Sequence, residues 1–526
     1  MGRSEELLKE LDEYLMTNLY PTHKIVVREA RDIYVYDVDG NAYLDFMTVV
    51  TTALLGHNPP GLADAIAETA KRLIAGNGYN WYTEELLNAA KAVLSLFPDK
   101  NLYNKVHFKL SGSEGIELAL KIAKRYTKNT YIMYLMGGYH GRTYLTGSYH
   151  GMRRREYGPL PPGTLIAPFP YPYRCPFGDM PPEECGKAAV ETIEYYINYV
   201  AIKDVCCLVT EPIQGVGGIV VPPMDFFERL KKVLDTYGIL LIFDEVQSGM
   251  GRTGTTWAFE QFNVKPDIVV AAKGMTGGLP ASAVVTRKEI TSAMQLNDEH
   301  STFGASAIIM AAVKATVDYY NMHKEELLSN AKKMGEYAMK RLMELYDKHP
   351  LIGDVRGLGL MIGIELVKNR KTKEPATKET SDICLNRALK RGVLFVTSGW
   401  NGNVIRFAPP LTVKQEHIDK AIEVLDKSLG RLITSYLAAT SGHCCVFNLP
   451  KPTQGISLAK AFITGSSKKH GAHQGAQKST TTILLLLIKS SKSLAPSSTT
   501  SLLDIFISSL AFLSIILFNS SSLSLT

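Results

Sequence analysis

The chain has 526 residues, of which 45% are hydrophobic and 21% are charged, and its formal net charge is +7 at pH 7. A chain of this length holds two or three domains and buries a large core. Most of the excess positive charge lies after residue 437, where seven lysines accompany a single acid, Asp504. The body is therefore nearly neutral, and its charge gives no reason to expect nucleic-acid binding.

The seven cysteines are scattered and show no metal-binding spacing, so no metal site is expected. Cys206 and Cys207 lie in the apolar run VCCLV and are expected in the core. Cys175 and Cys185 bracket a loop that a disulfide would close, a pairing that the sequence leaves open. No disulfide framework is indicated, and the first residues predict an acidic amphipathic helix instead of a secretory leader. A cytoplasmic location is expected.

Helical periodicity in the first hundred residues predicts helices over residues 1–17, 61–75 and 83–97. Between the first two, residues 33–46 alternate apolar and polar side chains around Asp39 and Gly40, which predicts a hairpin. His57 follows in a Gly-His-Asn-Pro-Pro turn and is expected to be a packed loop residue.

The turn SGSEG at 111–115 joins a strand predicted over 105–110 to a helix predicted over 116–127. Free N–H groups and the positive end of a helix dipole favour a bound phosphate at such a turn. The alternative is an ordinary helix start, with Ser113 as the N-cap and Glu114 in the first turn. The turn lacks the ending of a P-loop, so nucleoside triphosphate binding is not expected.

Two carboxylates and a lysine follow neighbouring apolar runs. The run 239–243 predicts a buried strand of a parallel sheet and ends on Asp244 and Glu245, and a second run at 267–270 is followed by Lys273. Ligands of open α/β sheets bind beyond the carboxyl ends of the strands. An acid there can keep a proton on a ring nitrogen, and a desolvated lysine can act as a nucleophile or form a Schiff base.

The stretch from Asp244 to Lys273 resembles the active-site core of the class III, pyridoxal-phosphate-dependent aminotransferases. The family pattern is D-E-[VI]-Q-x-G-x-G-R-T-G, then P-D-[IV] and A-K-[GS], and this chain carries each fixed position. The resemblance covers about residues 15–436 and departs from the family at Gly115, Val216, and the pair Ala305 and Ser306. Further matching motifs are SGSEG (111–115), GGYHGRT (137–143), EPIQGVGG (211–218), GGLPASAVV (277–285), HSTFGAS (300–306) and RFAPPL (406–411).

The resemblance implies a role for each motif. Lys273 would form the Schiff base with pyridoxal 5′-phosphate, and Asp244 would keep the ring nitrogen protonated. Arg406 would bind the substrate α-carboxylate, Arg142 would reach a second carboxylate, and Glu211 would pair with an arginine as a gate. The other implied cofactor contacts are Gly112 and Ser113 at the phosphate, Tyr139 on the ring face, Gln247 at the ring oxygen, and Thr302 at the phosphate of the neighbouring subunit's cofactor. His140 is expected to be only a neighbour of this site.

The implied fold is the α/β fold type I of pyridoxal-phosphate enzymes. A large domain with a mostly parallel seven-stranded sheet would span residues 61–310, and a smaller α+β domain would be built from residues 1–60 and 311–436. Because Thr302 would complete a neighbouring site, the resemblance implies a homodimer or a dimer of dimers. Residues 437–526 are rich in Ser, Thr, Leu and Lys. They are expected to be disordered or extraneous, and a membrane anchor is not favoured despite the apolar run 502–518.

The leading functional hypothesis is transfer of an amino group from an ω-amino donor such as 4-aminobutyrate to 2-oxoglutarate, the 2-oxo acid acceptor. Arg142, Glu211 and Arg406 support it, as does the GGLP segment. An amino-acid racemase or epimerase of the same fold would use the same residues and return the proton to the same carbon. An acetylornithine- or ornithine-type aminotransferase is a further alternative. A non-catalytic binding protein is not favoured, because Lys273 and Asp244 are both present.

Overall fold

The structure is a computed structural model that describes residues 2–17, 23–76, 78–147 and 159–440. The last helix, α13 (Gln415–Thr440), extends slightly beyond the end at residue 436 that the sequence predicts. The remaining expectations for the tail, including its apolar run 502–518, lie outside the described residues. Within the described part, no helix is long and apolar enough to cross a membrane.

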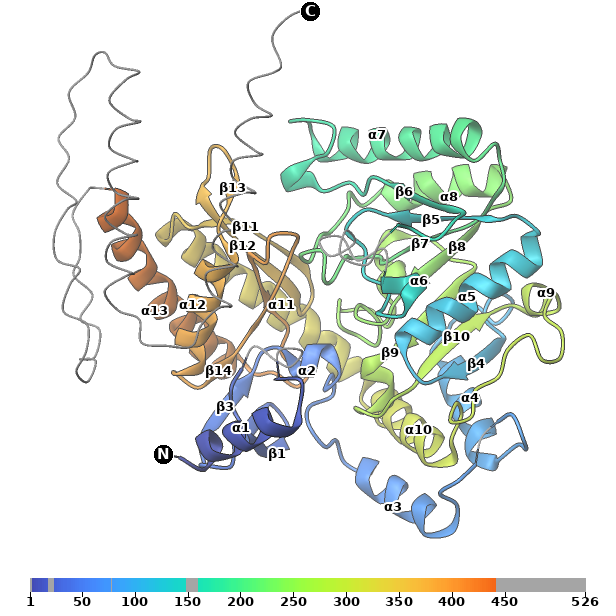
Figure 1. The fold of residues 1–526 in the computed structure, drawn as a ribbon, viewed down its shortest axis with the longest axis horizontal. Helices are drawn as coiled ribbons and strands as arrows, with labels where there is room; N and C mark the ends of the chain where they lie inside the picture. Colours follow the sequence, from blue (N-terminus) through green and yellow to red (C-terminus); the bar gives the residue numbers. More distant parts are fainter. Residues whose placement is uncertain (1, 18–22, 77, 148–158, 441–526) are drawn as a thin grey trace, which may run out of the picture. The chain divides into compact units, whose positions relative to one another are not determined.

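A seven-stranded sheet forms the centre of the larger part of the chain, in the order β4-β10-β9-β8-β7-β5-β6 (Figure 1). Strands β5 to β9 pair with one another in parallel, whereas β10 pairs antiparallel with both β9 and β4. The expected mostly parallel α/β sheet is confirmed. The strands are β4 (Lys105–Lys109), β5 (Tyr131–Leu135), β6 (Thr164–Ala167), β7 (Val205–Thr210), β8 (Leu240–Asp244), β9 (Ile268–Ala272) and β10 (Ser282–Thr286).

Side chains of the central strands alternate between two cores, because successive residues of a strand point to opposite faces. On β8, Leu240 and Ile242 join the core beneath α5 (Gly112–Thr127), whereas Leu241 and Phe243 join the larger core on the other face. A strand covered on both faces is apolar at every position, which is why the run 239–243 was readable as a buried strand. The helices on the larger core include α4 (Glu84–Ser95), α7 (Pro182–Tyr195), α8 (Phe226–Thr236) and α10 (Ala307–Met322).

Two smaller sheets combine segments from both ends of the described chain (Figure 1). In one, β1 (Val27–Arg31), β2 (Tyr34–Asp37) and β3 (Ala42–Asp45) are joined by β14 (Val393–Leu394), which pairs with β3 in parallel. The other has the order β11-β12-β16-β15, with β13 (Glu374–Pro375) beside β12. Its strands are β11 (Ile352–Leu358), β12 (Met361–Asn369), β15 (Val396–Ser398) and β16 (Val404–Phe407). The remaining helices are α1 (Arg3–Tyr14), α2 (Thr48–Thr51), α3 (Leu62–Arg72), α6 (Tyr144–Gly147), α9 (Lys288–Thr291), α11 (Lys324–Lys348) and α12 (Lys378–Leu389).

Within the described residues, the cysteines are either disulfide-bonded or buried free thiols. Cys175 and Cys185, whose pairing the sequence left open, are joined by a disulfide. Cys206 and Cys207 lie in β7 and are fully buried, as a core position requires.

Candidate active site

A cavity of about 570 Å³ lies beyond the carboxyl ends of the parallel strands. The turn after β9 contributes Lys273, the end of β8 contributes Asp244, and β16 contributes Arg406. Ligands are expected at this edge of an α/β sheet, because the loops that follow parallel strands converge there. Of the other residues predicted from the sequence, Gly112, Ser113, Tyr139, Arg142 and Gln247 also line this cavity.

Lys273 is partly buried and occupies a strained backbone conformation, with φ of 44° at the start of a 3₁₀ turn (Lys273–Thr276). Burial lowers the pKa of its amine to about 8, and the nearby charge of Arg406 acts in the same direction. Strain of this kind is concentrated at functional sites. A lysine with this pKa has a substantial neutral fraction near neutral pH and can act as a nucleophile or a base.

Asp244 is held by a residue that was expected to be only a neighbour. Nδ1 of His140 lies 2.9 Å from Oδ2 of Asp244, and the backbone N–H of Val246 donates to Oδ1 at 3.1 Å. His140 is buried, and its Nε2 has no hydrogen-bond partner among the described residues. The imidazole therefore fixes the orientation of the carboxylate from one side.

The amino end of α5 opens toward the cavity, as expected for an anion site. The N-cap is Ser111, whose Oγ accepts from the N–H of Glu114 at 3.2 Å, so the assignment of Ser113 as the cap is wrong. The helix begins one turn earlier than its periodicity suggested, because Gly112 and Ser113 already have helical geometry. Ser113 Oγ instead accepts from the N–H of Arg142 at 3.1 Å. A Cβ at Gly141 would lie 2.2 Å from that Oγ, so this approach requires a glycine.

Arg406 is a buried cation. Its Nη2 donates to Oε1 of Gln247 at 2.6 Å, and its Nε has no hydrogen-bond partner among the described residues. Burial lowers its pKa to about 10, and the charge of Glu211 partly opposes this. No carboxylate of the described chain lies within ion-pair distance of the guanidinium, which suits it to bind a ligand carboxylate.

Glu211 does not form the expected ion pair with an arginine in this structure. Its Oε1 accepts from the N–H of Tyr139 at 2.9 Å, and its Oε2 accepts from the N–H of Gly215 at 2.9 Å. The two backbone turns that follow β5 and β7 converge on the carboxylate and occupy both oxygens. Burial, together with the negative charge of Asp244, raises the pKa of Glu211 to about 7.

The two remaining predicted residues differ in location. Nε of Arg142 donates to the hydroxyl of Tyr139 at 3.1 Å, so the guanidinium and the aromatic ring lie together at the cavity wall. Thr302 is exposed and does not line the cavity of its own chain.

This donor set fits pyridoxal phosphate. The amino end of α5 would hold the phosphate, the buried carboxylate of Asp244 a ring nitrogen, and Tyr139 the ring face, while Lys273 would supply the amine. Together with the mostly parallel sheet, the site defines a pyridoxal-phosphate-dependent enzyme of fold type I.

Comparisons with known proteins narrow this class. The sequence profile of the family described as aminotransferase class-III matches residues 16–429. The chain belongs to the class III aminotransferase family.

Similar proteins in this family carry out different reactions. An alanine/serine racemase of Pyrococcus horikoshii is 37% identical over 82% of this chain and 91% of its own length. A probable 4-aminobutyrate aminotransferase of Bacillus subtilis is 32% identical over 75% of this chain and 90% of its own. Among solved structures, taurine:2-oxoglutarate aminotransferase from Bifidobacterium kashiwanohense, in complex with PLP and glutamate, is 27% identical and covers 83% of this chain and 99% of its own, with a TM-score of 0.77.

Proposed function

We propose that this enzyme transfers the amino group of an ω-amino donor such as 4-aminobutyrate to 2-oxoglutarate. The observation that carries the proposal is that Arg142 and Arg406 line the same cavity as Lys273. A dicarboxylate acceptor has two anionic ends, and two guanidinium groups around one amine can bind both. The similarity to a probable 4-aminobutyrate aminotransferase agrees with this choice.

The residues of the chain would divide the work as follows. Pyridoxal phosphate, when bound, supplies the electron-accepting ring. Asp244, oriented by His140, keeps a proton on the ring nitrogen. Arg406, which donates to Gln247, holds the substrate carboxylate, and Lys273, with its lowered pKa, accepts and returns the proton of the substrate carbon.

Racemisation or epimerisation of a neutral amino acid is the second candidate. The 37% identity to an alanine/serine racemase favours it. The carboxylate of Glu211 also favours it, because both oxygens accept from backbone N–H groups instead of pairing with an arginine. A neutral amino acid has one carboxylate, for which Arg406 suffices. Lys273 would then return the proton to the carbon from which it came.

A single set of assays separates the two candidates. The purified enzyme is incubated with 4-aminobutyrate, ornithine, L-alanine or L-leucine, each with and without 2-oxoglutarate, and glutamate and enantiomer ratio are measured by chiral chromatography. The proposal expects glutamate from 4-aminobutyrate only when 2-oxoglutarate is present. D-alanine or D-leucine formed without any 2-oxo acid, and no glutamate from any donor, would reject it in favour of the racemase.

The proposal includes a homodimer with shared sites and the two-domain division at residues 61–310. Thr302 is exposed, and Phe303 beside it is 68% exposed, so this segment is accessible to a second copy. Light scattering is expected to give the mass of a dimer or a multiple of it. Thr302→Ala is expected to weaken cofactor binding without changing that mass, and unchanged cofactor binding would remove Thr302 from the proposed site.

A further inference from the structure

A second cavity of about 200 Å³ lies beside the first, at the carboxyl ends of β5, β6 and β7. One side is formed by the loops that follow these strands, including Phe169 and Arg174. The other side is formed by Glu365 of β12 and by the segment that contains Trp400. The proposed reaction has no use for this cavity, since neither Lys273 nor Asp244 lines it.

Two backbone segments form the wall between the cavities. Val216 lines the Lys273 cavity, whereas Gly217 lines the second one. The N–H of Gly399 donates to the carbonyl of Val216 at 2.8 Å, and Nε2 of Gln214 donates to the carbonyl of Met136 at 2.9 Å. The wall is thus tied to its surroundings by hydrogen bonds, and the two spaces are separate sites.

Most of the lining is apolar. Pro168, Phe169, Trp400 and Val404 contribute aromatic or aliphatic surface. A dry cavity of about 150 Å³ is large enough to bind benzene. A cavity of about 200 Å³ therefore accommodates a benzene ring or a branched chain with one small polar group.

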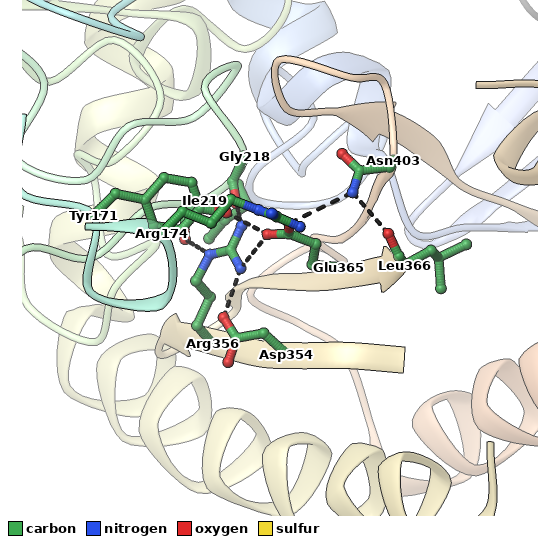
Figure 2. Close-up of polar contacts among 9 residues, drawn as sticks. All are labelled: Tyr171, Arg174, Gly218, Ile219, Asp354, Arg356, Glu365, Leu366 and Asn403. Atoms are coloured by element: carbon green, nitrogen blue, oxygen red, sulfur yellow. Dashed lines mark hydrogen bonds and ion pairs between the residues drawn. The ribbon is translucent and has the colours of Figure 1, made fainter. Parts of the chain in front are cut away.

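At the polar end of the cavity, ion pairs and hydrogen bonds surround the carboxylate of Glu365 (Figure 2). Glu365 accepts from Nε of Arg174 at 2.6 Å and from Nη1 of Arg356 at 2.8 Å, and it also accepts from the hydroxyl of Tyr171. Arg356 is itself occupied by Asp354 and by the carbonyls of Gly218 and Ile219. Nη2 of Arg174, in contrast, is buried and has no hydrogen-bond partner among the described residues.

These contacts define the chemistry of a ligand. A carboxylate oxygen in the cavity would accept from the guanidinium of Arg174, which lines it, and such charge-assisted hydrogen bonds are the strong ones. An ammonium group would find Glu365 already occupied by two guanidinium groups. The apolar lining would cover a ring or a branched chain.

We propose that this second cavity is a binding site for a small carboxylate that carries an aromatic ring or a branched aliphatic chain and no ammonium group. Arg174 binds the carboxylate, and Phe169 and Trp400 cover the apolar part. The disulfide between Cys175 and Cys185 anchors the loop that carries Arg174, so the site is largely formed before the ligand arrives.

The test uses 4-fluorobenzoate and the purified full-chain enzyme loaded with pyridoxal phosphate. Fluorine NMR is expected to show saturable binding. The ligand should also quench tryptophan fluorescence. Loss of this quenching in Trp400→Phe would place the ligand in the cavity. Arg174→Gln is expected to weaken binding at least about tenfold. The matched control is Arg229→Gln, an exposed arginine on α8, which should leave the affinity unchanged.

Two further variants make the result decisive. Met136 lines the cavity and is 45% exposed, so a larger side chain at this position narrows the cavity without crowding the core. Met136→Phe should therefore abolish binding. This variant keeps the test valid if Arg174→Gln folds poorly. Arg406→Gln tests the substrate cavity and should leave this binding intact. Binding that is lost in Arg406→Gln but retained in Arg174→Gln and Met136→Phe would overturn the proposal, as would tighter binding of 4-fluorophenylglycine than of 4-fluorobenzoate.

Discussion

Nδ1 of His140 lies 2.9 Å from Oδ2 of Asp244, and both side chains are buried. The ring of His140 also packs against Tyr134, with 5.6 Å between the ring centroids. This contact makes His140 the support of the carboxylate that we propose for the ring nitrogen of the cofactor. A residue that fixes the orientation of a catalytic group affects the reaction even when it does not contact the substrate.

His140→Ala is therefore expected to lower kcat by about 10- to 100-fold, a loss comparable to that of other orienting partners. The pH at which the bound cofactor changes its absorbance should also move, because the carboxylate is no longer fixed. His140→Asn, whose amide can donate from nearly the same position, should recover part of the rate. Equal losses in both variants, accompanied by equal losses of thermal stability, would point to a packing role alone.

The lowered pKa of Lys273 gives a pH prediction. In the enzyme stripped of cofactor, the reaction of Lys273 with an amine-directed reagent should rise with pH around a midpoint of about 8, since only the neutral amine reacts. Arg406→Gln removes a positive charge and should shift this midpoint upward, whereas Arg229→Gln should not. Peptide mass spectrometry over a pH series measures the extent of reaction, and a midpoint near 10.5 in the unaltered enzyme would contradict the burial of the amine.

The same pKa shift affects stability. Between pH 8 and 10.5, the ordinary pKa of a lysine amine, the unfolded chain binds more protons at this lysine than the folded chain does. The cost of burying the charged amine is therefore fully present below pH 8 and disappears as the pH rises through this window.

The central strands and the candidate site residues at their ends were predictable from the sequence. The run 239–243 is apolar at every position because both faces of β8 are covered, and it leads directly to Asp244. Lys273 follows β9 in the same way. Local pattern is sufficient for such residues, because the strand places its own end at the edge of the sheet.

The contact of His140 with Asp244 could not be read from the sequence, because it depends on how the turn after β5 folds across the end of β8. The glycines of GGYHGRT were its only local signal, since Gly137 and Gly141 have φ of 91° and 139°. The hydrogen bonds to Glu211 were unpredictable for the same reason, because they depend on how the turns after β5 and β7 converge. The second cavity is equally non-local, because its walls come from loops and strands far apart in the chain.

The left-handed backbone conformation of α2, at the mouth of the active site, was also unpredictable, because β-branched residues disfavour a positive φ. Thr48, Val49, Val50 and Thr51 have φ between 48° and 70°, although all four are β-branched. The turn is held by Asp45, whose Oδ1 accepts from the N–H of Thr48 at 2.7 Å, and His57 in turn hydrogen-bonds Asp45 at 2.9 Å. The surrounding contacts thus override local preference.

Val49→Gly is expected to raise the free energy of unfolding by about 1 kcal/mol, because a left-handed conformation costs an L-residue about 1–2 kcal/mol and glycine much less. Val49 is 49% exposed, so little packing is lost. Urea denaturation measures the change. Val49→Ala serves as the control, since it keeps the Cβ and should gain less; a destabilised Val49→Gly would show that the side chain contributes more than the strain costs.

The disulfide between Cys175 and Cys185 should stabilise the enzyme. Closing a loop across 10 residues of separation contributes about 2–3 kcal/mol by the loop-entropy account. Cys175→Ser is expected to lower the free energy of unfolding by that amount, and dithiothreitol should affect the unaltered enzyme but not the variant. Titration of all seven cysteines as free thiols in the unfolded, unreduced protein would show that the pair is not bonded.

The account rests on Lys273 as the amine that binds pyridoxal phosphate, and borohydride trapping tests this directly. Borohydride reduces a carbon–nitrogen double bond between an amine and the cofactor to a stable link, which peptide mass spectrometry then locates. The account predicts a pyridoxyl group on Lys273 alone, and no trapped cofactor or turnover in a folded Lys273→Ala variant. Trapping on a different lysine, or an active Lys273→Ala enzyme, would contradict it.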